Sequence, residues 1–304
     1  DGGGGHPCMC ENCRRLDPSN AAEHHYAFGG GEPTKYVELT DRVLWFFNQV
    51  VDGALKARPD KKGLTFFPYS VYLKPPVAVR PDPRLIPLSV AGNYTDAKNW
   101  ASARENVATW INLGLETYWR PNLMWGWKTL GPQNFARRLF DDYETMKANG
   151  LKGTDFDCVN GQFATKGLIF YVMTVALRNP DHLCYDDVVA DYCKAGFGKA
   201  ADDVAAYFAA LEEMTNAGIA AKRGNNGFLA CLDVERLAKV LDRAEKAAAG
   251  DAEVLARLAY LRRGVDAGRI ERKIGAAWDA KDRAAVKAAQ EELRAFMRRS
   301  AFEE

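Results

Sequence analysis

The stretch from Gly150 to Pro180 constrains the fold of this chain more than any other part of it. Residues 152–157 have the composition of a short strand that ends in two acids, Asp155 and Asp157. The almost entirely apolar run at 165–177 predicts a buried helix, because a helix that crosses a bilayer takes ~20 residues. Barrels built from βα units present catalytic acids in this way, at strand ends that lead into buried helices. A structural turn with solvated aspartates is the alternative interpretation.

Strand-like and helix-like segments alternate through the first 180 residues. Such alternation predicts a parallel α/β architecture. A closed barrel needs eight strands, so four strands predict the C-terminal half of a TIM-like (β/α)8 barrel, or else a smaller open sheet. Asp1 would close a further strand lying upstream. The predicted strands are 64–69, 85–90, 115–119 and 152–157, and the predicted helices are 40–58, 104–113, 135–148 and 165–177.

The composition of the chain changes after Pro180, where alanine-rich segments with many charged residues replace the predicted strands. Apolar residues recur there at helical spacing, which predicts bundle helices with a solvated outer face. We therefore expect two domains, a partial barrel over 1–180 and an all-α domain over 181–304. The expected helices of the second domain are 186–195, 200–215, 233–249, 252–263 and 282–300.

Three cysteines crowd the first thirteen residues in the spacing C-x-C-x-x-C, at Cys8, Cys10 and Cys13. With His6 they offer the three thiolates and one imidazole that a tetrahedral zinc site needs. Reduced thiols or a local disulfide are the alternatives, and we expect any zinc to stiffen the loop rather than take part in chemistry. The following residues 17–34 have loop composition and carry His24 and His25. We expect surface histidines there, and a catalytic or ligand role is the alternative interpretation.

The net charge and the cysteine count of the chain limit the classes of partner and of fold to be expected. A net charge of +1 over 304 residues provides no electrostatic attraction to nucleic acid or to anionic membranes. The chain has seven cysteines, which is an odd number. Three lie close together near the N-terminus and the others lie in or beside apolar stretches, which is not the pattern of a disulfide framework. No membrane span and no signal peptide is visible, but the first residue is Asp1 rather than Met.

The loop after the strand at 115–119 is rich in indole rings, with Trp119, Trp125 and Trp127 within nine residues. Because loops run over the surface, three tryptophans there favour a platform for stacking sugar rings over a role in the core alone. Covering the mouth of a partial barrel is the other interpretation. Tyr69 and Tyr72 would extend the same rim, and Tyr118 shares one side of its strand with Glu116.

A set of short motifs, in a fixed order, resembles a known family. The set comprises the glycine-rich start running into C-x-C-x-x-C, a helix with Asn48, and an aromatic strand leading to Pro75-Pro76. It continues with G-L-K-G at 150–153, the segment YVMTVALRNP, and D-Y-C-K-A-G-F-G-K-A-A at 191–201. Together these segments, from Asp1 to about Glu245, resemble domain-of-unknown-function family 4838, grouped with glycoside hydrolase family 163.

The resemblance implies a (β/α)8-barrel glycosidase with a helical C-terminal domain, exported by the cell and releasing N-glycans at β-linked N-acetylglucosamine. It also implies that the N-terminal half of the barrel is missing from this chain. Family members often have Glu at the end of the Gly-x-Lys-Gly strand, where this chain has Asp157.

Glycoside cleavage takes two carboxyl groups, ~5–5.5 Å apart when the anomeric configuration is retained. With the resemblance, this chemistry leads us to expect a retaining glycoside-hydrolase-like protein that acts on an oligosaccharide or N-glycan and needs no cofactor. Its candidate catalytic acids are Asp1, Glu116, Asp155 and Asp157, all expected at strand ends. The second hypothesis is a non-catalytic carbohydrate-binding or helical interaction module on a degenerate barrel. We predict that the isolated chain does not hydrolyse a chromogenic N-acetylglucosaminide.

Overall fold

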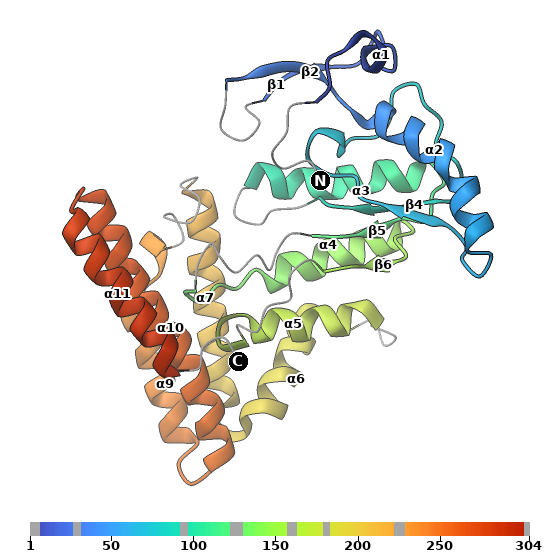
Figure 1. Ribbon diagram of the computed structural model, residues 1–304. Coiled ribbons are helices and arrows are strands. Elements are labelled where there is room, and N and C mark those ends of the chain that lie inside the picture. Colours follow the sequence, from blue (N-terminus) through green and yellow to red (C-terminus); the bar gives the residue numbers. More distant parts are fainter. Residues whose placement is uncertain are drawn as a thin grey trace. The chain divides into compact units, whose positions relative to one another are not determined.

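A computed structural model of the protein describes residues 7–26, 32–91, 97–121, 130–156, 163–178, 183–221 and 229–300 (Figure 1). The chain forms two compact units. The first comprises residues 1–93, 98–123 and 145–157, and the second comprises 94–97, 124–144 and 158–304. Within the described ranges, no helix is both long and apolar enough to cross a membrane.

The first unit is a mixed α/β structure. Its regular elements are α1 (Glu11–Arg14), β1 (Glu23–Tyr26), β2 (Thr34–Val37), α2 (Thr40–Ala57), β3 (Leu64–Phe66), η2 (Ser70–Tyr72), β4 (Leu85–Ser89), α3 (Ala97–Asn112), β5 (Tyr118–Trp119) and β6 (Gly153–Thr154). Helix α4 (Ala136–Ala148) begins in the second unit and ends in the first.

Four parallel strands form the sheet of the first unit in the order β3-β4-β5-β6, so neighbours in space are also neighbours along the chain (Figure 1). The carboxyl ends of all four strands consequently lie at one edge. The parallel α/β prediction is confirmed. The strands are shorter than expected, since β6 has two residues in place of 152–157. Its hydrogen bonds nevertheless continue to Asp155, whose N–H donates to the Trp119 carbonyl over 2.9 Å.

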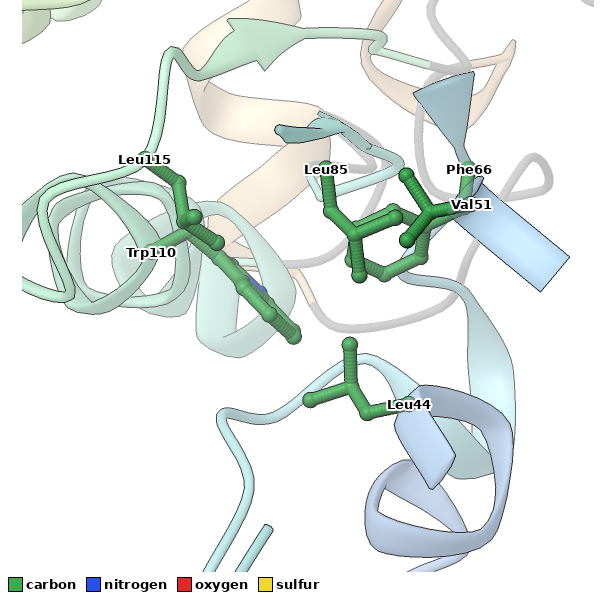
Figure 2. Close-up of a cluster of buried hydrophobic side chains, with 6 residues drawn as sticks. All are labelled: Leu44, Val51, Phe66, Leu85, Trp110 and Leu115. Carbon is green, nitrogen blue, oxygen red and sulfur yellow. The ribbon is translucent and has the colours of Figure 1, made fainter. Parts of the chain in front are cut away.

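The core of the first unit lies between α2, α3 and the sheet. Figure 2 shows the buried side chains that form it: Leu44, Val51, Phe66, Leu85, Trp110 and Leu115. The rings of Phe66 and Trp110 meet edge to face at 5.5 Å, and the Trp110 indole N–H donates to the Leu73 carbonyl over 3.0 Å. This last bond ties the chain after β3 to α3, and therefore helps to position the loop at the carboxyl end of β3.

Residues 17–34, expected to be a loop, instead contain strand β1 and the first residue of β2. Strands β1 and β2 pair antiparallel, with Glu23 opposite Val37 and Tyr26 opposite Thr34. The loop prediction was wrong because β1 is polar and has no apolar alternation of its own. Strand β1 forms because it pairs with β2, in which Tyr36 is buried against Val71 of η2.

The second unit is helical, as predicted. Its elements are α5 (Phe163–Arg178), α6 (Tyr185–Phe197), η3 (Gly198–Ala200), α7 (Ala201–Ala220), α9 (Val234–Ala247), α10 (Ala252–Asp279) and α11 (Arg283–Ser300). Helix α5 was expected in the barrel half, whereas its contacts group it with these helices.

Helix α10 continues 16 residues beyond the predicted end at Arg263, through two glycines that lower helix propensity. Close packing explains their presence. A Cβ at Gly264 would lie 2.8 Å from Thr165 Cγ2, and one at Gly268 would lie 2.8 Å from Leu232 Cδ2. The two glycines therefore allow neighbouring segments to approach α10 closely, which a pattern of propensities does not reveal.

Candidate functional site

Three side chains from three different strand ends meet at the carboxyl edge of the sheet. Phe67 follows β3, Arg120 follows β5 and Asp155 follows β6. Arg120 Nη1 donates a short hydrogen bond to Asp155 Oδ2, and the guanidinium lies over the Phe67 ring, 5.0 Å from its centroid. We call these three residues the strand-end cluster.

Backbone hydrogen bonds fix the positions from which this cluster projects. The N–H of Arg120 donates to the Ser89 carbonyl over 2.8 Å, which extends the pairing of β4 with β5 by one residue. The Thr154 hydroxyl donates to the Trp119 carbonyl over 2.7 Å and holds β6 in the same register. The cluster therefore stands on regular strands rather than on free loops.

The exposure of the strand-end cluster leaves it open to a ligand. Phe67 is 44% exposed, and the side chain of Asp155 is 43% exposed. Arg120 is less accessible, at 22%. A partly exposed aromatic ring beside a carboxylate and a guanidinium offers stacking together with charge-assisted hydrogen bonds, which suits a ligand ring that carries hydroxyl groups.

Glu116 and Tyr118 form a separate pair at the opposite edge of the sheet. The Tyr118 hydroxyl donates to Glu116 Oε1 over 3.1 Å. Glu116 precedes β5, and Arg120, which faces Asp155, lies four residues further along, or about 13 Å at strand spacing. The structure therefore does not bring Glu116 and Asp155 together at the separation that a glycosidase pair needs.

The predicted aromatic residues differ in their surroundings. Trp119 is fully buried, and its indole N–H donates to the Ala91 carbonyl over 2.6 Å. Tyr69 and Tyr72 are half-buried around η2, where burial raises the pKa of Tyr72. Between them Ser70 has a φ of 50°, the left-handed region that non-glycine residues seldom adopt. The loop after β3 is thus held in a defined, strained conformation.

Several predicted residues lie outside the described part of the chain. These are Asp1, His6, Trp125, Trp127 and Asp157.

A buried acid that sequence analysis did not single out lies beside the loop after β3. Glu38, between β2 and α2, is 8% exposed, and its Oε2 lies 3.2 Å from His24 Nε2 of β1. Burial raises the pKa of Glu38 to about 7 from the ordinary 4.5, although the charge and backbone of Lys74 act in the opposite direction. Within the described residues, Glu38 Oε1 and His24 Nε2 make no hydrogen bond of good geometry.

The residues that sequence analysis missed had only weak signals. Phe67 was assigned to the interior of a strand that in fact ends one residue earlier, at Phe66. Arg120 is the first residue after a predicted strand, a position that favours function in parallel sheets. Glu38 was obscured because its neighbours in the hairpin were interpreted as a loop.

The three N-terminal cysteines converge. The Sγ atoms of Cys8, Cys10 and Cys13 all lie within 4.8 Å of one another, so the group could bind a metal ion. Hydrogen bonds from the Cys13 backbone and the Cys8 thiol lower the pKa of Cys10 to about 7, whereas hydrogen bonds with the thiols of Cys8 and Cys10 raise the pKa of Cys13 to about 11. Of Cys10 and Cys13, Cys10 is therefore the thiol that ionises first.

The helical unit contains an apolar pocket of about 800 Å³ between α5, α6 and α10. Two of its polar side chains are already engaged, since the Tyr171 hydroxyl donates to Asp191 over 2.5 Å and Arg257 Nη1 donates to the Gly196 carbonyl over 2.9 Å. The pocket therefore offers mainly aromatic surface. Its rings belong to Phe163, Phe170, Tyr171, Tyr192, Phe197 and Tyr260.

These observations define a mixed α/β protein with a parallel sheet, a polar and aromatic cluster at the carboxyl edge of that sheet, and a helical C-terminal region. A family model described as "Domain of unknown function (DUF4838)" matches residues 4–209, more than half of the 304 residues. The chain belongs to this family. No curated protein and no solved structure matches it.

Proposed function

We propose that the strand-end cluster binds carbohydrate, in a glycoside-hydrolase-like protein that acts on N-acetylglucosamine-containing glycans. The observation that carries this proposal is the arrangement of Arg120 over Phe67 and against Asp155. Family membership supports it, because the resemblance noted in the sequence links this family to glycan-releasing glycosidases.

The chemistry of each side chain suggests its role. Phe67 would stack against the apolar face of a pyranose. Asp155 accepts a charge-assisted hydrogen bond from Arg120, and its partly exposed carboxylate would orient a sugar hydroxyl. Asp157 remains a predicted partner carboxylate for a retaining reaction.

We also propose that the sheet is the C-terminal half of a (β/α)8 barrel. Four parallel strands in chain order, with α3 between β4 and β5 and α4 between β5 and β6, are the repeat from which such barrels are built. The abbreviated connection from β3 to β4 contains only η2 in place of a full helix.

Isothermal titration of the 304-residue chain with an N-acetylglucosamine oligosaccharide tests the proposal. We expect saturable binding that Phe67→Ala weakens about tenfold or more, since an aromatic contact with a ring is worth roughly 1–3 kcal/mol. Trp45→Ala is the matched control, because Trp45 is a similarly exposed aromatic on α2, outside the cluster. Equal affinities for the two variants and the wild type would count against the cluster as the site.

A second function is favoured by the aromatic pocket of the helical unit. In this alternative the chain is a non-catalytic module that binds its ligand or partner through α5, α6 and α10. The same titration separates the two proposals, because Tyr171→Ala would then reduce binding while Phe67→Ala would not. Absence of turnover on a chromogenic N-acetylglucosaminide is expected under either proposal for this chain.

We propose Zn²⁺ as the metal that Cys8, Cys10 and Cys13 take up, in a structural role. Three thiolates are typical zinc ligands, and tetrahedral geometry with Zn–S bonds of ~2.3 Å sets the sulfurs ~3.8 Å apart. The observed spread, up to 4.8 Å, closes to this value with small side-chain movements. Zinc analysis of the purified chain should give about one equivalent, and none in Cys10→Ser.

A further inference from the structure

Arg42 of α2 makes contacts that neither the carbohydrate proposal nor the fold explains. Its Nη1 donates to the Cys8 carbonyl over 2.6 Å, so it binds the backbone of a thiol-bearing residue directly. Its Nε and Nη2 donate to the two carboxylate oxygens of Asp17, each over 2.5 Å. One guanidinium therefore spans the segment before α1 and the segment after it.

We call the contacts of Arg42 with Asp17 and with the Cys8 carbonyl the Arg42 clasp, and its ion pair is largely shielded from water. The side chains of Arg42 and Asp17 are only 12% and 15% exposed, unlike most surface ion pairs of the chain. A fork-shaped, shielded Arg–carboxylate pair fixes geometry far better than an exposed pair does. The guanidinium is thus a rigid bridge, and its third contact is made with the thiol segment.

The backbone segments that Arg42 joins, the first turn of α2 and the turn of α1, are also well fixed. Arg42 lies in the first turn of α2, two residues before Leu44, which is fully buried in the core cluster of Figure 2. On the other side, Cys10 caps α1 and Cys13 lies in its single turn, where the Arg14 N–H donates to the Cys10 carbonyl over 3.0 Å. The thiol group therefore rests on the core of the first unit through Arg42.

We propose that Arg42 is a positioning residue for metal binding at Cys8, Cys10 and Cys13, and that metal uptake and docking of the thiol segment on α2 are one coupled equilibrium. The inference rests on the proposed zinc site. Because Asp17 already balances the charge of Arg42, the guanidinium acts on the site by holding the Cys8 backbone in place. Residues that hold metal ligands in place typically contribute 10- to 100-fold to metal affinity.

The test is a titration of the reduced, metal-free 304-residue chain with Co²⁺, followed through the thiolate-to-cobalt charge-transfer absorption and the visible d–d bands. Competition with Zn²⁺ then gives the zinc affinity. We expect Arg42→Met to bind metal about 10- to 100-fold more weakly than the wild type. Arg42→Lys should recover part of the loss, because an ammonium keeps the charge without the fork.

Two further variants isolate the cause. Asp17→Asn should weaken metal binding in the same direction, since it loosens the clasp while leaving Arg42 and the thiols in place. Cys184→Ser is the matched control, because Cys184 is an exposed cysteine before α6 in the other unit, and its titration should equal that of the wild type. Circular dichroism of each variant confirms that the chain is folded.

The outcomes separate the two proposals. A charge-transfer band that Cys13→Ser abolishes, together with wild-type affinity in Arg42→Met, would overturn the coupling while zinc binding stands. Absence of the band in the wild type would overturn both. Neither result depends on saccharide binding, so the carbohydrate proposal is judged separately.

Discussion

Arg120 and Asp155 lie 35 residues apart in the sequence and form an ion pair at the carboxyl ends of adjacent strands, β5 and β6. The pair exists because two consecutive strand–helix repeats end at the same edge of a parallel sheet. Phe67 reaches the pair from β3, two strands away. Residues remote in the chain therefore form a surface of mixed aromatic and charged character.

The first prediction concerns this pair. We expect Asp155→Asn and Arg120→Met each to weaken binding of an N-acetylglucosamine oligosaccharide about 10-fold, since a hydrogen bond to a charged group is worth roughly 1.5–3 kcal/mol. Stability should change by less than about 1 kcal/mol, because the pair is partly exposed. Titration calorimetry and urea unfolding measure the two effects.

Glu116→Gln is the control for the first prediction. Glu116 is an exposed acid at the other edge of the sheet, so its substitution should leave affinity unchanged. Loss of affinity in Glu116→Gln, with Asp155→Asn unaffected, would place the sugar at the wrong end of β5 for the proposed site.

The second prediction concerns the pH dependence of stability. Burial raises the pKa of Glu38 to about 7, so the folded state holds this proton more tightly than the unfolded state does. The contribution of Glu38 is therefore complete below about pH 4.5 and is lost as the pH rises to about 7. A shift of this size corresponds to at most about 3 kcal/mol.

Glu38→Gln removes the ionisation and keeps the shape of the side chain. We expect the variant to be more stable than the wild type at pH 8, and the difference to shrink towards zero at pH 5. His24 and Lys74 are the basic groups beside Glu38, and their attraction for the carboxylate reduces the difference. Urea unfolding at both pH values is the measurement, and a variant less stable at pH 8 would contradict the prediction.

The third prediction concerns Asp41, a buried carboxylate on α2. It accepts the consecutive backbone N–H groups of Val77, Ala78 and Val79 over 2.9, 2.8 and 2.6 Å, and so shapes the proline-rich segment before β4. Asp41→Asn replaces one acceptor oxygen by a donor, which leaves a backbone N–H without a partner. We expect a loss of about 1–3 kcal/mol in urea unfolding.

Asp52→Asn is the matched comparison for the third prediction. Asp52 is also on α2, but it is exposed and pairs with Arg84 over 2.7 Å at the surface. The change should cost less than about 1 kcal/mol. Similar losses for the two variants would show that the bonds of Asp41 do not shape the segment as inferred.

Much of the fold could be predicted from the sequence, because local patterns determine it. The apolar stripe of α2 and the buried run of α5 predict helices that the structure confirms, and alternation of strands with helices predicts the parallel sheet. The hairpin β1–β2 could not be predicted, since its order comes from pairing and from Tyr36 against Val71.

The candidate site could be predicted only in part, for a geometric reason. The rule that acids at strand ends gather at one edge identified Asp155 correctly as a residue of that edge. The rule does not say which side chains point towards solvent. Trp119 was expected on the surface, but it is buried and its indole N–H donates to the Ala91 carbonyl. The contact of Arg120 with Phe67 depends on strand order and on where β3 ends, neither of which the sequence reports.

The most direct test of the central claim is a chemical-shift map of the isotope-labelled 304-residue chain during titration with an N-acetylglucosamine disaccharide. We predict that the largest backbone amide shifts occur at Phe67, Arg120 and Asp155 and at their immediate neighbours. Shifts confined to α5, α6 and α10 around the aromatic pocket, or no shifts at a saturating concentration of sugar, would contradict the account.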